Sequence, residues 1–383
     1  MASSKKLKPK KPTKRIGIAL SGGLDSVVLL DAVSKAYPHD TLFALHIHHG
    51  LQKQADEWLI FCEQLAHRYQ IGFDFRLLYL HDQTGNVEAR ARTARYDALI
   101  DLCEVHDLDH LLLAHHQNDQ AETILLQLLR GAGPSGLSGM GGRKELRSAS
   151  GKQITLWRPL LEQNRAELEA YAKRQSLQWV EDPSNQNPHF RRNAVRKTIL
   201  PALSKIQPGA IANLARSAQL LAQAQTLLDR LAHADAKTLM QNGALHIAPL
   251  ITLQAKDQAS ANNVLRYWLK YHQLTMPSQE RLQAWWQDLA GTRSDKRLQW
   301  VHDGRTIRAW RGLLQIDPQL SQERVKRGEW IFVPVPPNSK QAGLPWDWYQ
   351  AALHNKTVES KAREGGERLK IKPNTPSKAL KNL

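Results

Sequence analysis

The sequence has few cysteines and no long hydrophobic run. Among its 383 residues only Cys62 and Cys103 are cysteines. So few exclude a disulfide scaffold, a cysteine-rich zinc site and a C-x-x-C redox or iron–sulfur motif. No apolar stretch approaches the roughly 18 to 20 residues that a membrane-spanning helix needs, and no apolar signal region follows the basic N-terminus. These absences predict a cytoplasmic protein that has no membrane partner.

Acidic residues are also few compared with basic ones. Lysine and arginine total 53 against 36 aspartate and glutamate, which leaves a formal charge of +17. An excess of this size predicts a polyanionic partner, with nucleic acid as the leading candidate, although it can also serve solubility alone. The lysine-rich start of the chain is interpreted as a solvated tail, with a loose phosphate contact as the alternative.

The first half of the chain alternates short apolar runs with longer amphipathic ones. The short runs cover residues 16–20, 42–48, 73–80 and 111–115, and the long ones 27–36, 58–69, 87–105 and 121–130. Four such pairs predict an α/β protein with a Rossmann-like parallel sheet that helices cover on both faces. Ligands are then expected beyond the carboxyl ends of the strands. The glycine-rich residues 131–142 are predicted to form a mobile loop without a helix over that site.

The length favours two or three domains. A Leu/Ala-periodic helix is predicted over 211–240, and two strand-like runs flank an Asp303-Gly304 turn. We therefore expect a basic tail (1–14), an α/β domain (15–215), a helical domain (216–320) and a small mixed α/β C-terminal domain (321–383). The tryptophans Trp285 and Trp286 are interpreted as core residues rather than base-stacking platforms.

A strand, a glycine turn and a helix meet at a predicted phosphate loop. Its residues are Ser21, Gly22, Gly23, Leu24, Asp25 and Ser26. Adjacent glycines let backbone N–H groups approach an anion, and the helix N-terminus adds a positive dipole end. No Walker lysine follows, and a plain glycine turn is the alternative. A carboxylate beside a phosphate is unfavourable unless a cation such as Mg²⁺ lies between them, so Asp25 is the candidate metal ligand.

Six motifs in order resemble the tRNA(Ile)-lysidine synthetases, N-type ATP pyrophosphatases of the PP-loop superfamily. They are SGGLDS at 21–26, HIHHGLQ at 46–52, NVEARARTARY at 86–96, AHHQNDQAET at 114–123, RPLL at 158–161 and EDPSNQN with RRN between 181 and 193. The match is dense over residues 15–215, and REGGERLK at 363–370 resembles the start of the family's C-terminal domain. Asn118 stands where many members have aspartate. The chain stops soon after residue 370, so the last domain is expected to be either incomplete or reduced in its role. The resemblance also implies that residues 15–215 form the catalytic domain and that residues 216–320 bind tRNA.

The resemblance implies a two-step reaction on the wobble cytidine of tRNA(Ile) with a CAU anticodon. The base is first adenylated by ATP, with Mg²⁺, and the ε-amine of L-lysine then displaces AMP to give lysidine. A second copy of the chain stays open as a partner. Arg191, Arg192 and Arg196 are assigned by the motif to RNA phosphate contacts, although such a cluster alone is more often a solvated surface.

Four further side chains are candidates for the chemistry. Asp119 and Glu122 lie three apart at a predicted helix start, where a carboxylate pair can bind an ammonium and act as general base. Stabilisation of the helix N-terminus is their alternative role. Arg92 is the preferred cation for a transferring phosphoryl group, with a solvated helix face as its alternative. His48, in a strand-end group with His46 and His49, is expected to contact adenine or another part of the substrate rather than a metal.

Three other functions compete. A tRNA thiolase of the same superfamily would require a close cysteine pair, which the sequence lacks. A metabolic amide synthetase would not need such a basic chain. A non-catalytic RNA-binding protein would not need Asp25, Asp119 and Glu122 together.

Overall fold

We describe the protein from a computed structural model, which covers residues 14–38, 41–48, 54–78, 87–183, 191–291 and 298–317 and two short strands near the C-terminus. The chain divides into two compact units, Met1–Asp317 and Pro318–Leu383. In the second unit, strands β12 (Arg368–Leu369) and β13 (Lys378–Ala379) pair antiparallel. Among the helices of the described part, none is both long and apolar enough to cross a membrane.

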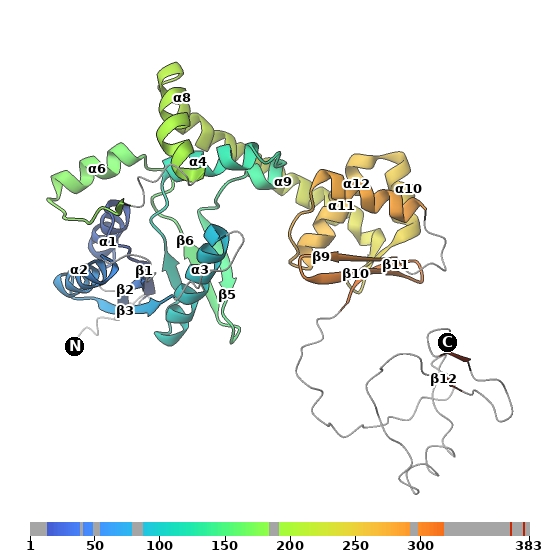
Figure 1. The fold of residues 1–383 in the computed structure, drawn as a ribbon, viewed down its shortest axis with the longest axis horizontal. Coiled ribbons are helices and arrows are strands. Elements are labelled where there is room, and N and C mark those ends of the chain that lie inside the picture. The colour runs from blue at the N-terminus through green and yellow to red at the C-terminus, as the bar shows by residue number, and fades with distance from the viewer. Residues whose placement is uncertain are drawn as a thin grey trace, which may run out of the picture. The chain divides into compact units, whose positions relative to one another are not determined.

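A six-stranded sheet forms the N-terminal half of the first unit (Figure 1). Its order is β3-β2-β1-β4-β6-β5, and every pair is parallel except the edge pair of β5 and β6. The strands are β1 (Arg15–Ala19), β2 (Thr41–His48), β3 (Gly72–Leu77), β4 (His110–Leu112), β5 (Arg143–Arg147) and β6 (Gln153–Trp157). The α/β class and its parallel sheet are confirmed, and β5 and β6 are additions that the prediction did not contain.

Each of the first four strands leads into a helix, as predicted. These helices are α1 (Leu24–Ala36), α2 (Ala55–Arg68), α3 (Val87–Val105) and α4 (Gln117–Leu128). They are followed by α5 (Pro134–Leu137), α6 (Arg165–Arg174), α7 (Arg191–Ala194), the π-helix η2 (Val195–Ile199), α8 (Leu200–Ile206) and α9 (Ala210–Leu239). The expectation of a helix-free loop over 131–142 is wrong at α5, where Gly133 is the N-cap and Pro134 begins the helix.

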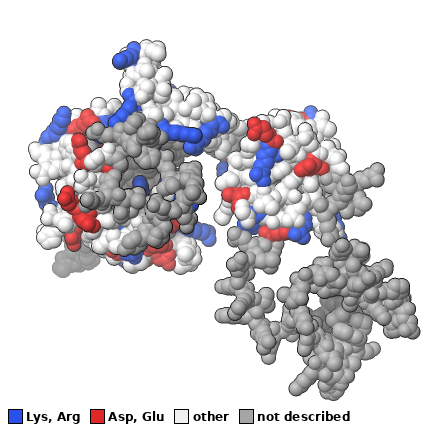
Figure 2. Space-filling model, in the orientation of Figure 1, with Lys and Arg blue, Asp and Glu red and all other residues white. Residues whose placement is uncertain are grey.

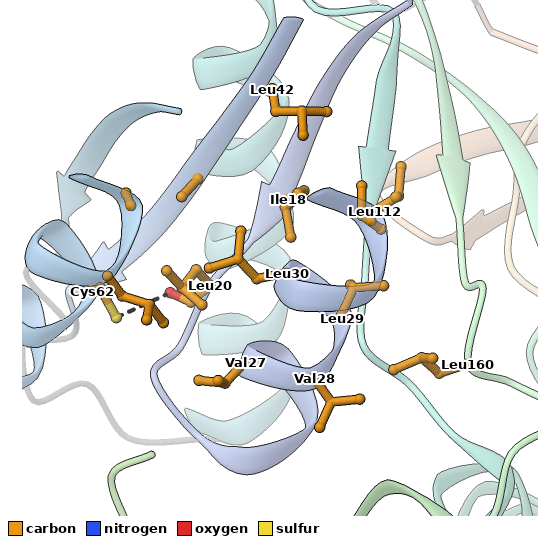
Figure 3. Close-up of a cluster of buried hydrophobic side chains, with 14 of the residues drawn as sticks. Ile18, Leu20, Val27, Val28, Leu29, Leu30, Leu42, Cys62, Leu112 and Leu160 are labelled. Atoms are coloured by element: carbon orange, nitrogen blue, oxygen red, sulfur yellow. Dashed lines mark hydrogen bonds between the residues drawn. The ribbon is translucent and has the colours of Figure 1, made fainter. Parts of the chain in front are cut away.

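Alternating strand residues pack into two apolar layers on opposite faces of this sheet. Ile16, Ile18 and Leu112 pack against α1, α2 and α6 in one cluster, part of which Figure 3 shows. Leu111 packs with α3 in another. Cys62 lies in the first cluster and Cys103 in the second, and burial raises the pKa of both thiols to about 12. The two cysteines are therefore protonated core residues.

A buried carboxylate joins three helices on one face of this sheet. Asp31 of α1 accepts hydrogen bonds from Tyr69 (2.8 Å), Tyr171 of α6 (2.6 Å) and Lys35 (2.9 Å). Burial opposes its ionisation, but these donors outweigh burial and hold the pKa of Asp31 below its ordinary 3.8.

Asp31 gives a prediction about acid stability. Asp31→Asn is expected to lower the free energy of unfolding at neutral pH by about 1 to 3 kcal/mol. The NH2 group of the amide would face the hydroxyl and ammonium groups that donate to the carboxylate in the wild type. A lowered pKa stabilises the fold above the unfolded value, and this contribution is lost as pH falls through the folded value. Urea midpoints of both proteins should therefore converge below about pH 4. A constant difference down to strong acid would contradict the role of the charge.

The C-terminal half of the first unit packs helices on a small antiparallel sheet. The helices are α10 (Ile247–Lys256), α11 (Gln258–Tyr271) and α12 (Gln279–Ala290). The sheet has the order β7-β8-β11-β10-β9, from strands β7 (Met240–Gln241), β8 (Ala244–His246), β9 (Leu298–His302), β10 (Arg305–Trp310) and β11 (Leu313–Ile316). Trp285 stacks on Trp300 with ring centroids 4.8 Å apart, and Trp285 and Trp286 are buried as expected. The predicted turn is also confirmed, since Asp303 and Gly304 both have positive φ between β9 and β10.

Helix α9 crosses the predicted domain boundary at residue 215. Its N-terminal part contacts α4, α5 and α8, and the same helix also contacts α11. The boundary itself stays a prediction.

Candidate functional site

The loop between β1 and α1 is braced by its own hydroxyl groups. Ser26 Oγ donates to the carbonyl of Gly23 (2.9 Å) and accepts from the backbone N–H of Ser21 (3.2 Å). Gly22 has φ +84°, and a Cβ there would lie 2.9 Å from Val180. The backbone N–H of Val180 donates to the Gly22 carbonyl (3.0 Å). Only glycine suits this position, and the turn is fixed before any ligand arrives.

The geometry of this loop fits an anion. Helix α1 begins without a side-chain cap, and within the described residues no hydrogen bond engages the backbone N–H groups of Leu24, Asp25 and Ser26. Open N–H groups at the start of a helix, together with its dipole, form an anion-binding site. The predicted loop residues 21–26 therefore lie together in an arrangement that can hold phosphate.

Asp25 links this loop to neighbouring elements. Its carboxylate lies 3.3 Å from Nη1 of Arg165, at the start of α6, and 3.5 Å from Nε2 of His116, just before α4. His116 Nε2 is also 3.4 Å from Asp119. The imidazole of His116 therefore stands between the carboxylate of the loop and a carboxylate of α4.

Two carboxylates and two guanidinium groups form a cluster beside the loop. Arg192 donates to Glu122 (2.7 Å) and to Asp119 (2.9 Å), and Arg196 donates to Glu122 (2.6 and 3.0 Å). The side chain of Glu122 is 0% exposed, so its charge depends on these protein partners rather than on water. Arg196 belongs to the π-helix η2, a local irregularity that is frequent at functional sites.

This cluster stays charged. Burial disfavours the ionised form of Asp119, but His116 and Arg192 outweigh burial and lower the pKa of Asp119. Burial likewise opposes the charge of Arg196, but its hydrogen bond to Glu122 raises the pKa of Arg196. Asp119 and Arg196 are therefore charged at neutral pH.

A cavity of about 160 Å³ opens beside the cluster. Polar walls come from His116, Glu122, Arg165 and Arg196, and apolar walls from Leu200, Pro201 and Ile211. A cavity with both charge signs and an apolar side suits a small zwitterion with an aliphatic stem.

The histidines at the end of β2 have protein partners. His46 Nδ1 lies 2.9 Å from the carbonyl of Leu20, and His48 Nε2 lies 2.9 Å from Asp56. His49 falls outside the described residues. Across the described ranges no group of three or more His, Cys, Asp or Glu side chains could hold a metal ion.

Comparisons with known proteins agree with this geometry. A family model described as the PP-loop domain matches residues 2–203, and one described as the TilS substrate binding domain matches residues 249–315. A tRNA(Ile)-lysidine synthase of Pectobacterium atrosepticum is 38% identical over 94% of this chain and 79% of that protein. One of Ralstonia nicotianae is 37% identical over 96% of this chain and 82% of that protein. The chain belongs to the tRNA(Ile)-lysidine synthase family.

This lysidine synthase family member also resembles a solved structure more distantly. A tRNA thiolase of Methanococcus maripaludis aligns with a TM-score of 0.46 and 20% identity, over 55% of this chain and 73% of that chain. Likeness at this level carries no argument about function.

The structure brings together most of the residues that the lysidine synthase motifs singled out. Asp25, Asp119, Glu122, Arg192 and Arg196 form one connected group. Phosphate contact by Arg192 and Arg196 stays a prediction, but their guanidinium groups already neutralise the two carboxylates of α4. Arg191 lies exposed on the neighbouring α7.

Arg92 and His48 contact residues outside this group. Arg92 is exposed on α3, with its guanidinium 5.7 Å from the ring centre of Tyr96, and its charge acts on His115 after β4. His48 ends β2 next to its partner Asp56. Their predicted contacts with phosphate and adenine stay predictions.

Sequence reasoning missed three residues of this site. Arg165 and His116 flank Asp25, and Arg158 contacts His115 (3.2 Å). Arg158 and His116 lie within quoted lysidine synthase motifs. The contacts of Arg158 with His115 and of His116 with Asp25 join residues too distant in sequence for spacing to reveal them. Asn118, the departure from the family pattern, accepts a hydrogen bond from the backbone N–H of Arg165 (3.0 Å), so it helps to hold the start of α6.

Proposed function

We propose that this protein is a ligase that joins L-lysine to carbon 2 of the wobble cytidine of tRNA(Ile) with a CAU anticodon. In the first step the carbon-2 oxygen attacks the α-phosphorus of ATP, and pyrophosphate leaves. In the second step the ε-amine of lysine attacks carbon 2, loses a proton, and AMP leaves with the former carbon-2 oxygen. One observation carries the proposal. Asp25 of the loop that can bind phosphate contacts His116, and His116 contacts the buried carboxylate–arginine cluster.

The loop is proposed to bind ATP. Residues Ser21 to Ser26 offer open backbone N–H groups to the phosphates, and His48 is proposed to contact adenine. Asp25 would hold Mg²⁺ together with phosphate oxygens, a common arrangement for this ion, which would neutralise charge on the leaving pyrophosphate. Arg92 is proposed to stabilise the transferring phosphoryl group.

The carboxylate pair is proposed to serve the lysine step. Glu122 lines the mixed-charge cavity, and Asp119 lies 3.4 Å from His116, which also lines it. An ammonium needs carboxylates both for binding and for loss of its proton. Because Arg192 and Arg196 occupy these carboxylates, lysine has to share or replace their hydrogen bonds.

Positive charge supports an RNA substrate. Figure 2 shows lysine and arginine side chains over α8 and next to α4. Exposed basic residues of this region are Arg191, Lys197, Lys205 and Arg216. Phosphate contacts of this kind position a nucleic acid without reading its sequence. Residues 249–315, which match the substrate-binding family model, are proposed to contribute to the choice of tRNA.

The buried cysteines disfavour a thiolase. Cys62 and Cys103 lie in different core clusters, and with pKa values of about 12 neither supplies a thiolate at neutral pH.

The test is transfer of radiolabelled lysine to tRNA. We expect label in unmodified tRNA(Ile) transcripts only when ATP and Mg²⁺ are present, with one pyrophosphate released per lysine. Methionine tRNA, which shares the CAU anticodon, is the matched control and should stay unlabelled. Pyrophosphate release without incorporation of lysine would contradict the ligase and favour another base-adenylating enzyme.

A further inference from the structure

His115 has a hydrogen-bond arrangement that defines its protonation. It follows β4 at the carboxyl edge of the sheet, and Nε of Arg158 lies 3.2 Å from its Nδ1. A guanidinium is a donor only and keeps its charge at every physiological pH. Nδ1 of His115 must therefore be the acceptor, and the proton of the neutral ring is on Nε2.

Arg158 is itself held in place. Its side chain is only 8% exposed, Nη1 donates to the carbonyl of Gly141 (2.7 Å), and Nη2 reaches the hydroxyl of Tyr96 on α3 (3.5 Å). The carbonyl of Gly141 is fixed in turn, because Gln120 of α4 bonds both backbone groups of Met140 (2.7 and 3.1 Å). This chain of contacts keeps Arg158 against the imidazole.

The charges around His115 also oppose a second proton. Burial is the largest influence, and the positive charges of Arg158, Arg192 on α7 and Arg92 on α3 act in the same direction. Asp119 on α4 acts in the opposite direction but does not offset them, and the pKa of His115 falls to about 3. His115 is therefore neutral at any pH at which the enzyme works.

We infer that His115 is a permanent Nε2–H donor to an anionic phosphoryl oxygen of the substrate, and that Arg158 is the positioning residue that fixes this tautomer. Among the described residues Nε2 has no hydrogen-bond partner, and Nε2 is not sealed from solvent. The guanidinium groups whose charges act on His115 favour an anion as its ligand. No proton is transferred, since loss of the Nε2 proton would leave an imidazolate.

The inference rests on the proposed function for the identity of the ligand, and a matched variant pair tests it. His115→Phe keeps a ring but removes the donor, and tRNA-dependent pyrophosphate release in a single turnover should fall by about 10²-fold. His115→Gln keeps an N–H near the same place and should retain most of the rate. His67→Phe, at an exposed position on α2, is the control and should not change the rate. Equal losses in the Phe and Gln variants would overturn the donor role.

The tautomer is tested separately by ¹⁵N NMR of the full-length protein labelled at histidine, with His115 assigned by its absence from the His115→Gln spectrum. We expect an unprotonated Nδ1 and a protonated Nε2 that do not change between pH 5 and 8. In Arg158→Met the proton of the ring should distribute between Nδ1 and Nε2, because the donor that fixes the tautomer is gone, whereas burial should keep the ring neutral over the same range. A wild-type His115 that titrates near pH 6 to 7, or carries its proton on Nδ1, would overturn the inference.

These two measurements separate failure of the inference from failure of the proposed function. If wild-type protein forms lysidine and His115→Phe adenylates tRNA at the wild-type rate, only the inference is wrong. If wild-type protein forms no lysidine but releases pyrophosphate with another tRNA substrate, the proposed function is wrong, and the donor is tested on that reaction.

Discussion

Asp25→Asn is expected to slow tRNA-dependent pyrophosphate release by about 10³-fold, because Lewis-acid stabilisation is worth several kcal/mol and each 1.4 kcal/mol is a factor of ten. Asparagine keeps the shape of the side chain but cannot balance the charge of a divalent cation beside phosphate. The first turn of α1 is braced by Ser26 rather than by Asp25, so the loop should keep its structure. Affinity for tRNA should not change, and the Mg²⁺ concentration for half-maximal rate should rise.

Asp31→Asn is the matched control, since Asp31 lies on the same helix and its hydrogen bonds join α1 to α6 and Tyr69. At a temperature where both variants are folded, Asp31→Asn should release pyrophosphate at the wild-type rate although its stability is lower. Similar losses of activity in the two variants would indicate general damage to α1. Normal pyrophosphate release by Asp25→Asn would refute the proposed role of Asp25.

The order of the elements was predictable because the parallel strands are buried on both faces. Residues 16–20 and 111–113 are almost continuously apolar, and each run leads into a helix. The β5–β6 hairpin was not predictable in the same way. Strand β5 reads RKELR and is mostly exposed at the sheet edge, where charged side chains are tolerated and no apolar pattern is needed.

The candidate site, like the fold, was predictable from the sequence only in part. Local spacing identified Asp119 and Glu122 on one face of α4, because three residues make nearly one helical turn. The partners of these carboxylates could not be deduced, since Arg192 lies 70 residues beyond Glu122 in sequence. The sequence suggested that the three arginines of the basic cluster face RNA. Two of them, Arg192 and Arg196, neutralise the carboxylates of α4.

The exchange of Arg192 and Arg196 together for methionine is expected to destabilise the protein by about 3 kcal/mol or more, because removal of one side of a buried ion pair leaves an uncompensated charge. Glu122 is fully buried, whereas the side chains of Arg192 and Arg196 are 22% and 34% exposed. Water that reaches the arginine side can relieve part of the effect, so the lower end of the usual range is expected. Urea or thermal unfolding of the variant and the wild type measures the difference.

The matched controls distinguish the buried pair from a general loss of positive charge. Arg191→Met removes an equivalent charge from an exposed neighbour and should change stability by less than about 0.5 kcal/mol. Adding Glu122→Gln to the double variant removes the unpaired charge and should recover most of the lost stability. A double variant as stable as Arg191→Met, or one that Glu122→Gln fails to rescue, would contradict the cluster as described.

The same set of variants separates a structural role of these arginines from RNA contact. If Arg192 and Arg196 act mainly as counter-charges, the rescued triple variant should bind tRNA with a salt dependence close to that of the wild type. If both also contact phosphates, the slope of log affinity against log salt should fall by about 1.4 to 1.8, since each lost contact removes about 0.7 to 0.9. A fall of that size in a stably folded triple variant would assign the two guanidinium groups to both the carboxylates and the RNA.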